Sequence, residues 1–204
     1  MLVALPRRML LAHGPASSRS VCLTFDDGPH PEHTPRLLDA LKAHGIVATF
    51  FLIGRCAEQY PAIARRIADE GHAIGNHSFT HELNRRVSSR ELIEEMRQTN
   101  RLFTEIIGDA SPLYRPVQGK VSASSLLKLW RARQTVVLWN VDPKDYARES
   151  SEEVRDWFQE HPLRSGDMVL MHDNHPHAAE VIPDLAASAR ERGLTFSTVD
   201  SWLK

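Results

Sequence analysis

Short apolar runs alternate with longer helical patterns along the chain after residue 20. This alternation is typical of repeated βα units that build a parallel sheet. Between the runs lie helical patterns such as residues 35–44, which Gly45 ends as a C-cap, and a helix that a Ser88/Glu91 capping box opens and that runs to about Ile107. The pattern predicts seven strands, at residues 21–25, 48–53, 73–76, 113–115, 136–141, 168–172 and 195–199.

Polar side chains capable of chemistry fall at the ends of these strands. In a parallel α/β barrel the carboxyl ends of the strands converge on one face, so residues far apart in the sequence meet there. We therefore expect one shared site. Its candidates, in chain order, are Asp26, Asp27, His77, Arg115, Asp142, Asp145 and His172.

Composition narrows the classes of partner. The chain has 25 basic and 26 acidic residues, for a formal net charge of -1, which gives no broad cationic surface for nucleic acid. The cysteines Cys22 and Cys56 sit in or beside apolar runs and are expected to be buried thiols rather than a disulfide framework. Pro6 and an arginine pair interrupt the first apolar stretch, which makes a poor signal peptide. We expect no membrane span and a cytoplasmic location.

Two short motifs suggest a metal site. Asp26 and Asp27 precede Gly28 and Pro29, and His77 and His81 are four residues apart. Taken separately, the carboxylates fit an ordinary turn and the histidines fit a surface pair. Taken together, a carboxylate and two imidazoles supply three ligands and leave positions open for water and substrate, as in a catalytic metal site.

The remaining candidates depend on their placement. Arg115 alone fits a surface arginine, and Asp142 and Asp145 alone fit turn chemistry around Pro143. His172 ends a strand, where an imidazole is placed to donate a proton. The histidines that follow, His175 and His177, surround Pro176, and we interpret them as spectators in a solvated loop rather than as part of a metal cluster.

With these residues assembled, the sequence from about residue 20 onward resembles the polysaccharide deacetylase family, carbohydrate esterase family four. The segment TFDDGP at residues 24–29 is similar to the family's first motif, which implies that Asp26 is the catalytic base and Asp27 a metal ligand. HSFTH at residues 77–81 is similar to the second motif, which implies that His77 and His81 complete the metal site.

RPVQG at residues 115–119 resembles the third motif. The resemblance implies that Arg115 holds the catalytic base and that the backbone amide of Gln118 helps to bind the oxyanion. The family usually has an aromatic residue where this chain has Gln118. The amide survives that change, whereas a surface for stacking a sugar does not.

DPKDY at residues 142–146 resembles the fourth motif, with Tyr146 in place of the usual tryptophan, and implies that Asp145 orients His172. LMH at residues 170–172 resembles the fifth motif. It implies that His172 is the general acid and that Leu170 forms a wall of the acetyl pocket.

The resemblance implies a distorted (β/α) barrel of about seven parallel strands, with an N-terminal extension at residues 1–19 and a catalytic domain at residues 20–204. It implies one divalent metal ion, zinc first and cobalt, nickel, manganese or iron as alternatives, and an N-acetylated carbohydrate as substrate. Three other interpretations stay open. They are a catalytically silent carbohydrate-binding relative, an O-acetyl esterase of the same family, and an iron oxygenase, which would leave Asp26, Arg115 and His172 without a role.

Overall fold

The computed structural model describes residues 5–82 and 88–203. Its centre is a parallel sheet in the order β1-β6-β5-β4-β3-β2-β7, with β8 paired to β2. The strands are β1 (Leu10–Leu11), β2 (Ser20–Asp26), β3 (Thr49–Leu52), β4 (Ala73–Asn76), β5 (Leu113–Tyr114), β6 (Thr135–Val137), β7 (Met168–His172) and β8 (Thr195–Phe196).

The sheet curls until its two sides meet. Beyond β6 the chain crosses to β7, where Val141 forms a parallel bridge with Val169 and the Leu170 amide donates to the Val141 carbonyl at 2.9 Å. The predicted fold, a distorted (β/α) barrel, is confirmed.

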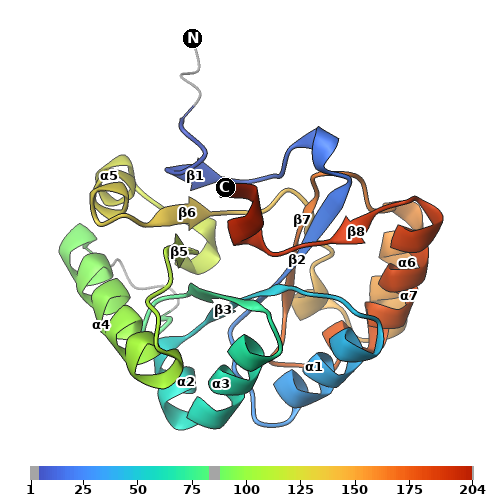
Figure 1. Cartoon of the computed structure of the whole chain (residues 1–204), viewed down its shortest axis with the longest axis horizontal. Helices are drawn as coiled ribbons and strands as arrows, with labels where there is room; N and C mark the ends of the chain where they lie inside the picture. Colours follow the sequence, from blue (N-terminus) through green and yellow to red (C-terminus); the bar gives the residue numbers. More distant parts are fainter. Residues whose placement is uncertain (1–4, 83–87, 204) are drawn as a thin grey trace.

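Helices cover the outside of the curled sheet on three sides of the view in Figure 1. They are α1 (His33–Ala43), α2 (Gly54–Gln59), α3 (Pro61–Asp69), α4 (Ser89–Ile107), α5 (Ala123–Arg131), α6 (Ser151–Glu160) and α7 (His177–Glu191). Short 3-10 turns complete the described chain: η1 (Ala16–Ser18), η2 (Val117–Gly119), η3 (Asp145–Ala147) and η4 (Val199–Leu203).

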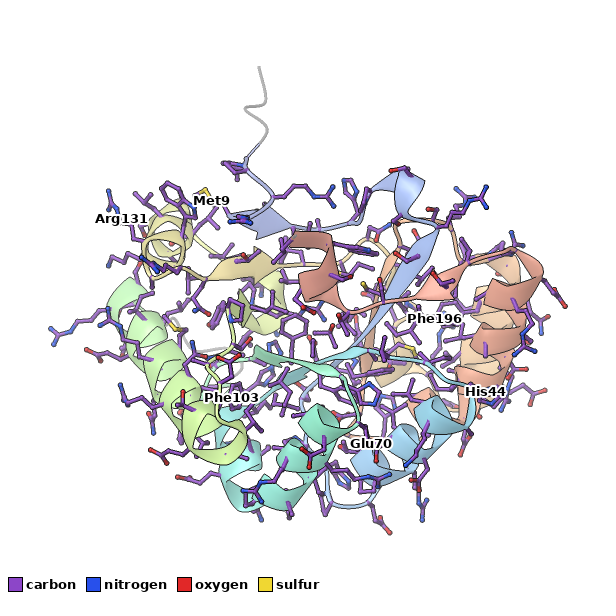
Figure 2. The ribbon with its side chains drawn as sticks, in the orientation of Figure 1. Met9, His44, Glu70, Phe103, Arg131 and Phe196 are labelled. Atoms are coloured by element: carbon purple, nitrogen blue, oxygen red, sulfur yellow. The ribbon has the colours of Figure 1, made fainter. Side chains whose placement is uncertain are left out.

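The longest helix, α4, shows how local sequence sets an element. Ser88 accepts from the Glu91 amide and the Glu91 carboxylate accepts from the Ser88 amide, which is the predicted capping box. Gly108 ends the helix with φ of 79°, a conformation that glycine adopts without strain. Phe103 lies between the helix and the sheet, whereas Arg131 of α5 lies at the periphery (Figure 2).

Three features of the sheet differ from the prediction. β1 was not predicted, because a two-residue strand in a segment interrupted by proline and arginine has no hydrophobic periodicity. It lies within the predicted N-terminal extension, residues 1–19, of which residues 1–4 are outside the described chain. β6 ends at Val137, because the residues after it turn to pair with β7. β8 ends at Phe196, because Val199 begins η4.

The cysteines are free; Cys22 is buried, as expected, whereas Cys56 is only partly buried. Among the described residues, no helix has both the length and the apolar character needed to cross a bilayer.

Phe103 is 1% exposed and anchors α4 to the main core. Phe103→Ala should lower the free energy of unfolding by about 3–5 kcal/mol, through lost burial and the cavity left behind. Leu127→Ala, at a helix position that is 36% exposed, should cost less than about 1 kcal/mol. Urea denaturation followed by circular dichroism measures both, and equal losses would contradict this account of the core.

Candidate active site

The end of β2 places two carboxylates at the carboxyl face of the barrel. Asp26 is the last residue of the strand, is 3% exposed, and lies opposite His172 in the register between β2 and β7. Asp27 follows with φ of 77°, a left-handed conformation that is uncommon for residues other than glycine. After this change of backbone direction Asp26 pairs with Arg115 and Asp27 with His81, while both carboxylates come within 3.6 Å of His77 Nε2.

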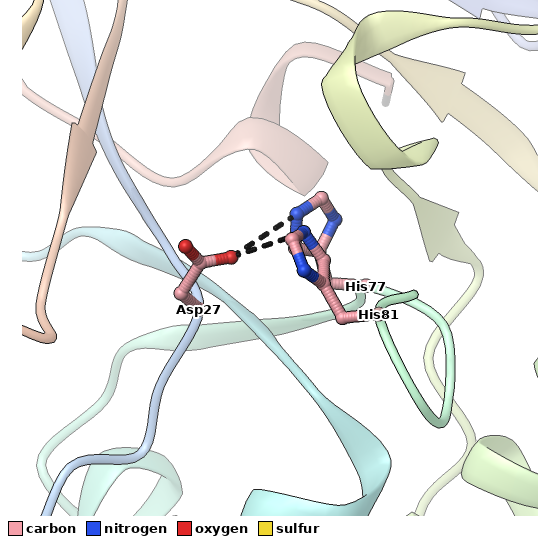
Figure 3. A group of neighbouring side chains, drawn as sticks. All are labelled: Asp27, His77 and His81. Atoms are coloured by element: carbon pink, nitrogen blue, oxygen red, sulfur yellow. Dashed lines mark ion pairs between the residues drawn. The ribbon is translucent and has the colours of Figure 1, made fainter. Parts of the chain in front are cut away.

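Asp27, His77 and His81 converge as the sequence predicted (Figure 3). Asp27 Oδ1 lies 3.2 Å from His81 Nε2 and 3.6 Å from His77 Nε2. The two imidazole rings have centroids 4.7 Å apart. Asp27 Oδ1 is buried and has no hydrogen-bond partner among the described residues. Together, a buried carboxylate oxygen and two imidazole nitrogens are a set of ligand atoms that suits a divalent ion.

His77 and His81 each turn Nε2 towards Asp27 Oδ1. His77 Nδ1 lies 2.8 Å from the Arg115 carbonyl oxygen; because that oxygen can only accept, Nδ1 carries the proton and Nε2 presents its lone pair. Burial, together with the neighbouring His77, lowers the pKa of His81 below its usual value. A neutral imidazole at neutral pH is the form that ligates a metal.

The loop that carries the two histidines is fastened to α4. Glu95 accepts from the Ser78 and Thr80 hydroxyls, the latter at 3.0 Å, and from the backbone amides of Phe79 and Thr80. Although burial favours the neutral form, these hydrogen bonds lower the pKa of Glu95, so it stays ionised. Asn76, the last residue of β4, accepts from the Ser78 amide at 2.9 Å and donates to the Met96 carbonyl at 2.8 Å.

Arg115 lies at the centre of the site and is 0% exposed. Its Nη1 donates to Asp26 Oδ1 at 2.7 Å and to Thr24 Oγ1 at 2.8 Å, while Nη2 donates to the Leu138 carbonyl at 3.1 Å. The guanidinium also packs over the Phe51 ring, 4.0 Å from its centroid. Burial lowers the pKa of Arg115, but a guanidinium stays charged in proteins and compensates the buried carboxylate of Asp26.

His172 and Asp145 form a second pair beside Asp26. His172 Nδ1 donates to Asp145 Oδ1 at 2.9 Å, and the His172 amide donates to Asp145 Oδ2 at 2.7 Å. Although burial favours the neutral imidazole, the hydrogen bond and charge of Asp145 raise the pKa of His172 to about 9. Burial acts against ionisation of Asp145 as well, but the hydrogen bond from His172, together with the nearby His175, lowers the pKa of Asp145 to about 2.

Of the three residues expected to contact substrate, Tyr146 and Leu170 lie on η3 and β7, the elements that carry Asp145 and His172. Tyr146 is 57% exposed and meets the His172 ring edge to face, with centroids 5.2 Å apart. Leu170 is buried in β7, in register with Thr24. Gln118 lies exposed on η2 with φ of 56°, and its side chain accepts from Lys120. Asp142 accepts from the Lys144 amide, which is the turn role that the sequence also allowed.

The sequence and structure both have close relatives. Residues 13–137 match the family model described as polysaccharide deacetylase. A chitooligosaccharide deacetylase from Bradyrhizobium sp. is 36% identical over 166 residues, which are 81% of this chain and 75% of that protein. The chain belongs to the polysaccharide deacetylase family, carbohydrate esterase family four.

Solved structures of this deacetylase family superimpose on nearly the whole chain. A peptidoglycan N-acetylglucosamine deacetylase aligns with a TM-score of 0.90 and 31% identity, covering 95% of this chain and 92% of that one. A carbohydrate esterase family four pseudoenzyme from Bacillus anthracis aligns with a TM-score of 0.87 and 26% identity, covering 96% of this chain and 69% of that one.

Four residues in or beside the site were missed or misjudged from the sequence. The interpretation of His175 as a solvated spectator was wrong, because its Nε2 lies 3.3 Å from Asp145 Oδ2; the loop after β7 folds back onto η3. His177 is partly buried at the start of α7. Glu95 was not considered, although it lies between the buried Ile93 and Met96.

Asp173 also escaped notice. It follows His172, is 1% exposed, and accepts from the Thr34 hydroxyl at 2.5 Å. Burial raises its pKa to about 7. A Cβ at Gly28 would collide with this carboxylate, so Asp173 packs directly beneath the turn that follows Asp27.

Glu95 gives a test of how the loop at residues 77–81 is held. Glu95→Ala should weaken Zn²⁺ binding by about 10–100-fold, because residues that orient metal ligands typically contribute this much. Glu94→Ala is the matched control, since Glu94 is exposed and forms an ion pair with Arg90 on the same helix. Isothermal titration of the metal-free protein measures both affinities. Unchanged affinity in Glu95→Ala would show that the loop keeps its shape without this carboxylate.

Proposed function

We propose that the chain is a metal-dependent hydrolase that removes acetyl groups from N-acetylated sugars, on a peptidoglycan or chitin-type oligosaccharide. The observation that carries the proposal is the convergence of Asp26, the Asp27–His77–His81 group and His172 on one face of the barrel. Membership of a family whose relatives are named deacetylases supports the same reaction.

In this proposal Asp27, His77 and His81 hold one divalent ion, with zinc as the first candidate because the donor set is one carboxylate and two imidazoles. When bound, the ion supplies Lewis acidity that polarises the attacking water and the acetamide carbonyl. The three protein ligands leave positions open for both.

Asp26 acts as the base that takes the proton of the attacking water. Arg115 fixes one of its oxygens by a hydrogen bond to Oδ1, and Oδ2 remains 3.6 Å from His77 Nε2, on the side of the metal group. The carboxylate is thereby held in one orientation beside the metal ligands. A base fixed in this way needs no rearrangement to accept the proton.

His172 acts as the acid that protonates the leaving amine. Asp145 receives its Nδ1–H, so the imidazole directs Nε2 away from that carboxylate and stays protonated at neutral pH. The backbone N–H of Gln118 is assigned to the developing oxyanion, and Leu170 and Tyr146 to the walls around the acetyl group and sugar.

Two alternatives predict different products. An O-acetyl esterase would release acetate from acetylated xylan and not from N-acetylglucosamine oligomers. Two observations favour a silent carbohydrate-binding relative. One structural neighbour is a pseudoenzyme. In addition, Gln118 stands where the family's third motif has an aromatic residue, and Tyr146 stands where the fourth motif has tryptophan. Such a relative would bind sugars without releasing acetate.

The test is acetate release from N-acetylglucosamine oligomers, peptidoglycan fragments and acetylated xylan, by protein loaded with one equivalent of Zn²⁺, with and without chelator. We expect chelator-sensitive release from the N-acetylated substrates. Asp26→Asn should lower kcat/KM by about 100-fold or more while still binding one equivalent of metal, which also reports that the variant is folded. Asp142→Asn is the matched control and should keep its activity. No release from any substrate by the zinc-loaded protein would overturn the proposal.

The His172–Asp145 pair predicts a pH dependence. With the pKa of His172 raised to about 9, the acid stays protonated up to that pH, and kcat/KM should fall only as pH rises through it. In Asp145→Asn the anion is gone, so the pKa of His172 should fall towards its ordinary value of about 6.5 and the alkaline limb should move to lower pH. A profile with the same alkaline limb in both proteins would remove His172 from the role of acid.

A further inference from the structure

A second group with the composition of the metal site lies on the other side of Asp26. It consists of Asp145, His172 and His175, and one potential ligand atom from each lies within 4.8 Å of the others. His172 Nδ1 is 2.9 Å from Asp145 Oδ1, and His175 Nε2 is 3.3 Å from Asp145 Oδ2. These spacings resemble the 3.2 Å and 3.6 Å found between Asp27 and its two histidines.

The hydrogen bonding of His175 is incomplete. Both of its ring nitrogens are buried, and neither has a hydrogen-bond partner among the described residues. The contact of Nε2 with Asp145 therefore has the distance of an ion pair without hydrogen-bonding geometry. Unpaired buried polar atoms are rare in folded proteins, and a bound ion is one of the arrangements that accounts for them.

The carboxylate of this group is also suited to a cation. The Asp145 side chain is 0% exposed, and both of its oxygens face imidazole nitrogens. One buried carboxylate and two imidazoles form a donor set that Zn²⁺ accepts, with an open position left for water. His172 and His175 are 13% and 21% exposed, so the group is reachable from solvent.

We propose that Asp145, His172 and His175 form a second site for a divalent cation, and that its occupation inhibits the enzyme. An imidazolium cannot ligate a metal, so His172 must release its proton to solvent when the ion binds. The metal-bound imidazole is neutral and lacks the proton that the leaving amine needs. Binding itself is independent of the proposed function, whereas inhibition rests on the proposed role of His172 as general acid.

Competition with that proton makes the second site weaker than the first. In the Asp27–His77–His81 group, His77 donates its Nδ1 proton to the Arg115 carbonyl oxygen and turns Nε2 towards Asp27, and Asp27 Oδ1 accepts no hydrogen bond from the described residues. Zinc should therefore fill the Asp27–His77–His81 group first and this group second. Activity should rise to one equivalent of zinc and fall above it.

The binding test is a Zn²⁺ titration of the metal-free full-length protein, with bound metal measured by elemental analysis after equilibrium dialysis. We expect two equivalents in the wild type, one in His175→Ala and two in His177→Ala. His177 is the matched control, because it begins α7 two residues after His175, its ring packs against the His175 ring, and it is outside the group. The single equivalent retained by His175→Ala shows that this variant is folded. One equivalent in the wild type, or two in His175→Ala, would overturn the second site.

The activity test measures acetate release at one equivalent of Zn²⁺ and at excess Zn²⁺. For each protein, the activity at excess Zn²⁺ is divided by that protein's own activity at one equivalent. Excess zinc should inhibit the wild type and His177→Ala at least tenfold and His175→Ala less than twofold. A second equivalent that depends on His175 but does not inhibit would uphold the site and contradict the role of His172 as acid. Equal inhibition of all three proteins would contradict inhibition through this site.

Discussion

Arg115 connects Asp26, the Asp27–His77–His81 group and the wall of the barrel. Its guanidinium binds Asp26 and Thr24 of β2 and the carbonyl of Leu138, and its own carbonyl accepts from His77. A charge buried at 0% exposure is stable only if it is paired and hydrogen-bonded, and removing one partner of such a pair typically costs about 3–5 kcal/mol. The orientation of Asp26 and the tautomer of His77 therefore depend on one residue, which couples the position of Asp26 to that of the Asp27–His77–His81 group.

The positions of His77 and His81 depend on helix packing as much as on the sheet. The loop with His77 and His81 includes two residues with positive φ, Ser78 and His81, and such backbone persists only where its surroundings hold it. Glu95 supplies that support from α4, and the amides of Gly54 and Arg55 at the start of α2 donate to the carbonyls of Ser78 and Phe79. The packing of α2 and α4 therefore helps to set the positions of His77 and His81.

The sequence predicted the barrel and brought the right side chains to one face, because strand ends in a parallel barrel converge regardless of loop detail. It placed Asp26 beside Arg115 and His172 beside Asp145, and those contacts are present. It failed where position depends on packing. Glu95 reaches the loop only because α4 lies across it, and His175 reaches Asp145 only because the chain turns back after β7.

The two groups on either side of Asp26 differ in what their carboxylates do. Asp27 Oδ1 has no hydrogen-bond donor among the described residues, which leaves it available to a metal. The two oxygens of Asp145 accept hydrogen bonds from the imidazole and the backbone amide of His172; despite burial, the bond to the imidazole and the charge of Asp145 raise the pKa of that imidazole to about 9. The same ligand types therefore favour a metal at one position and a proton at the other. Because Asp26 on β2 lies in register with His172 on β7, Asp26 separates the Asp27–His77–His81 group from the Asp145–His172–His175 group.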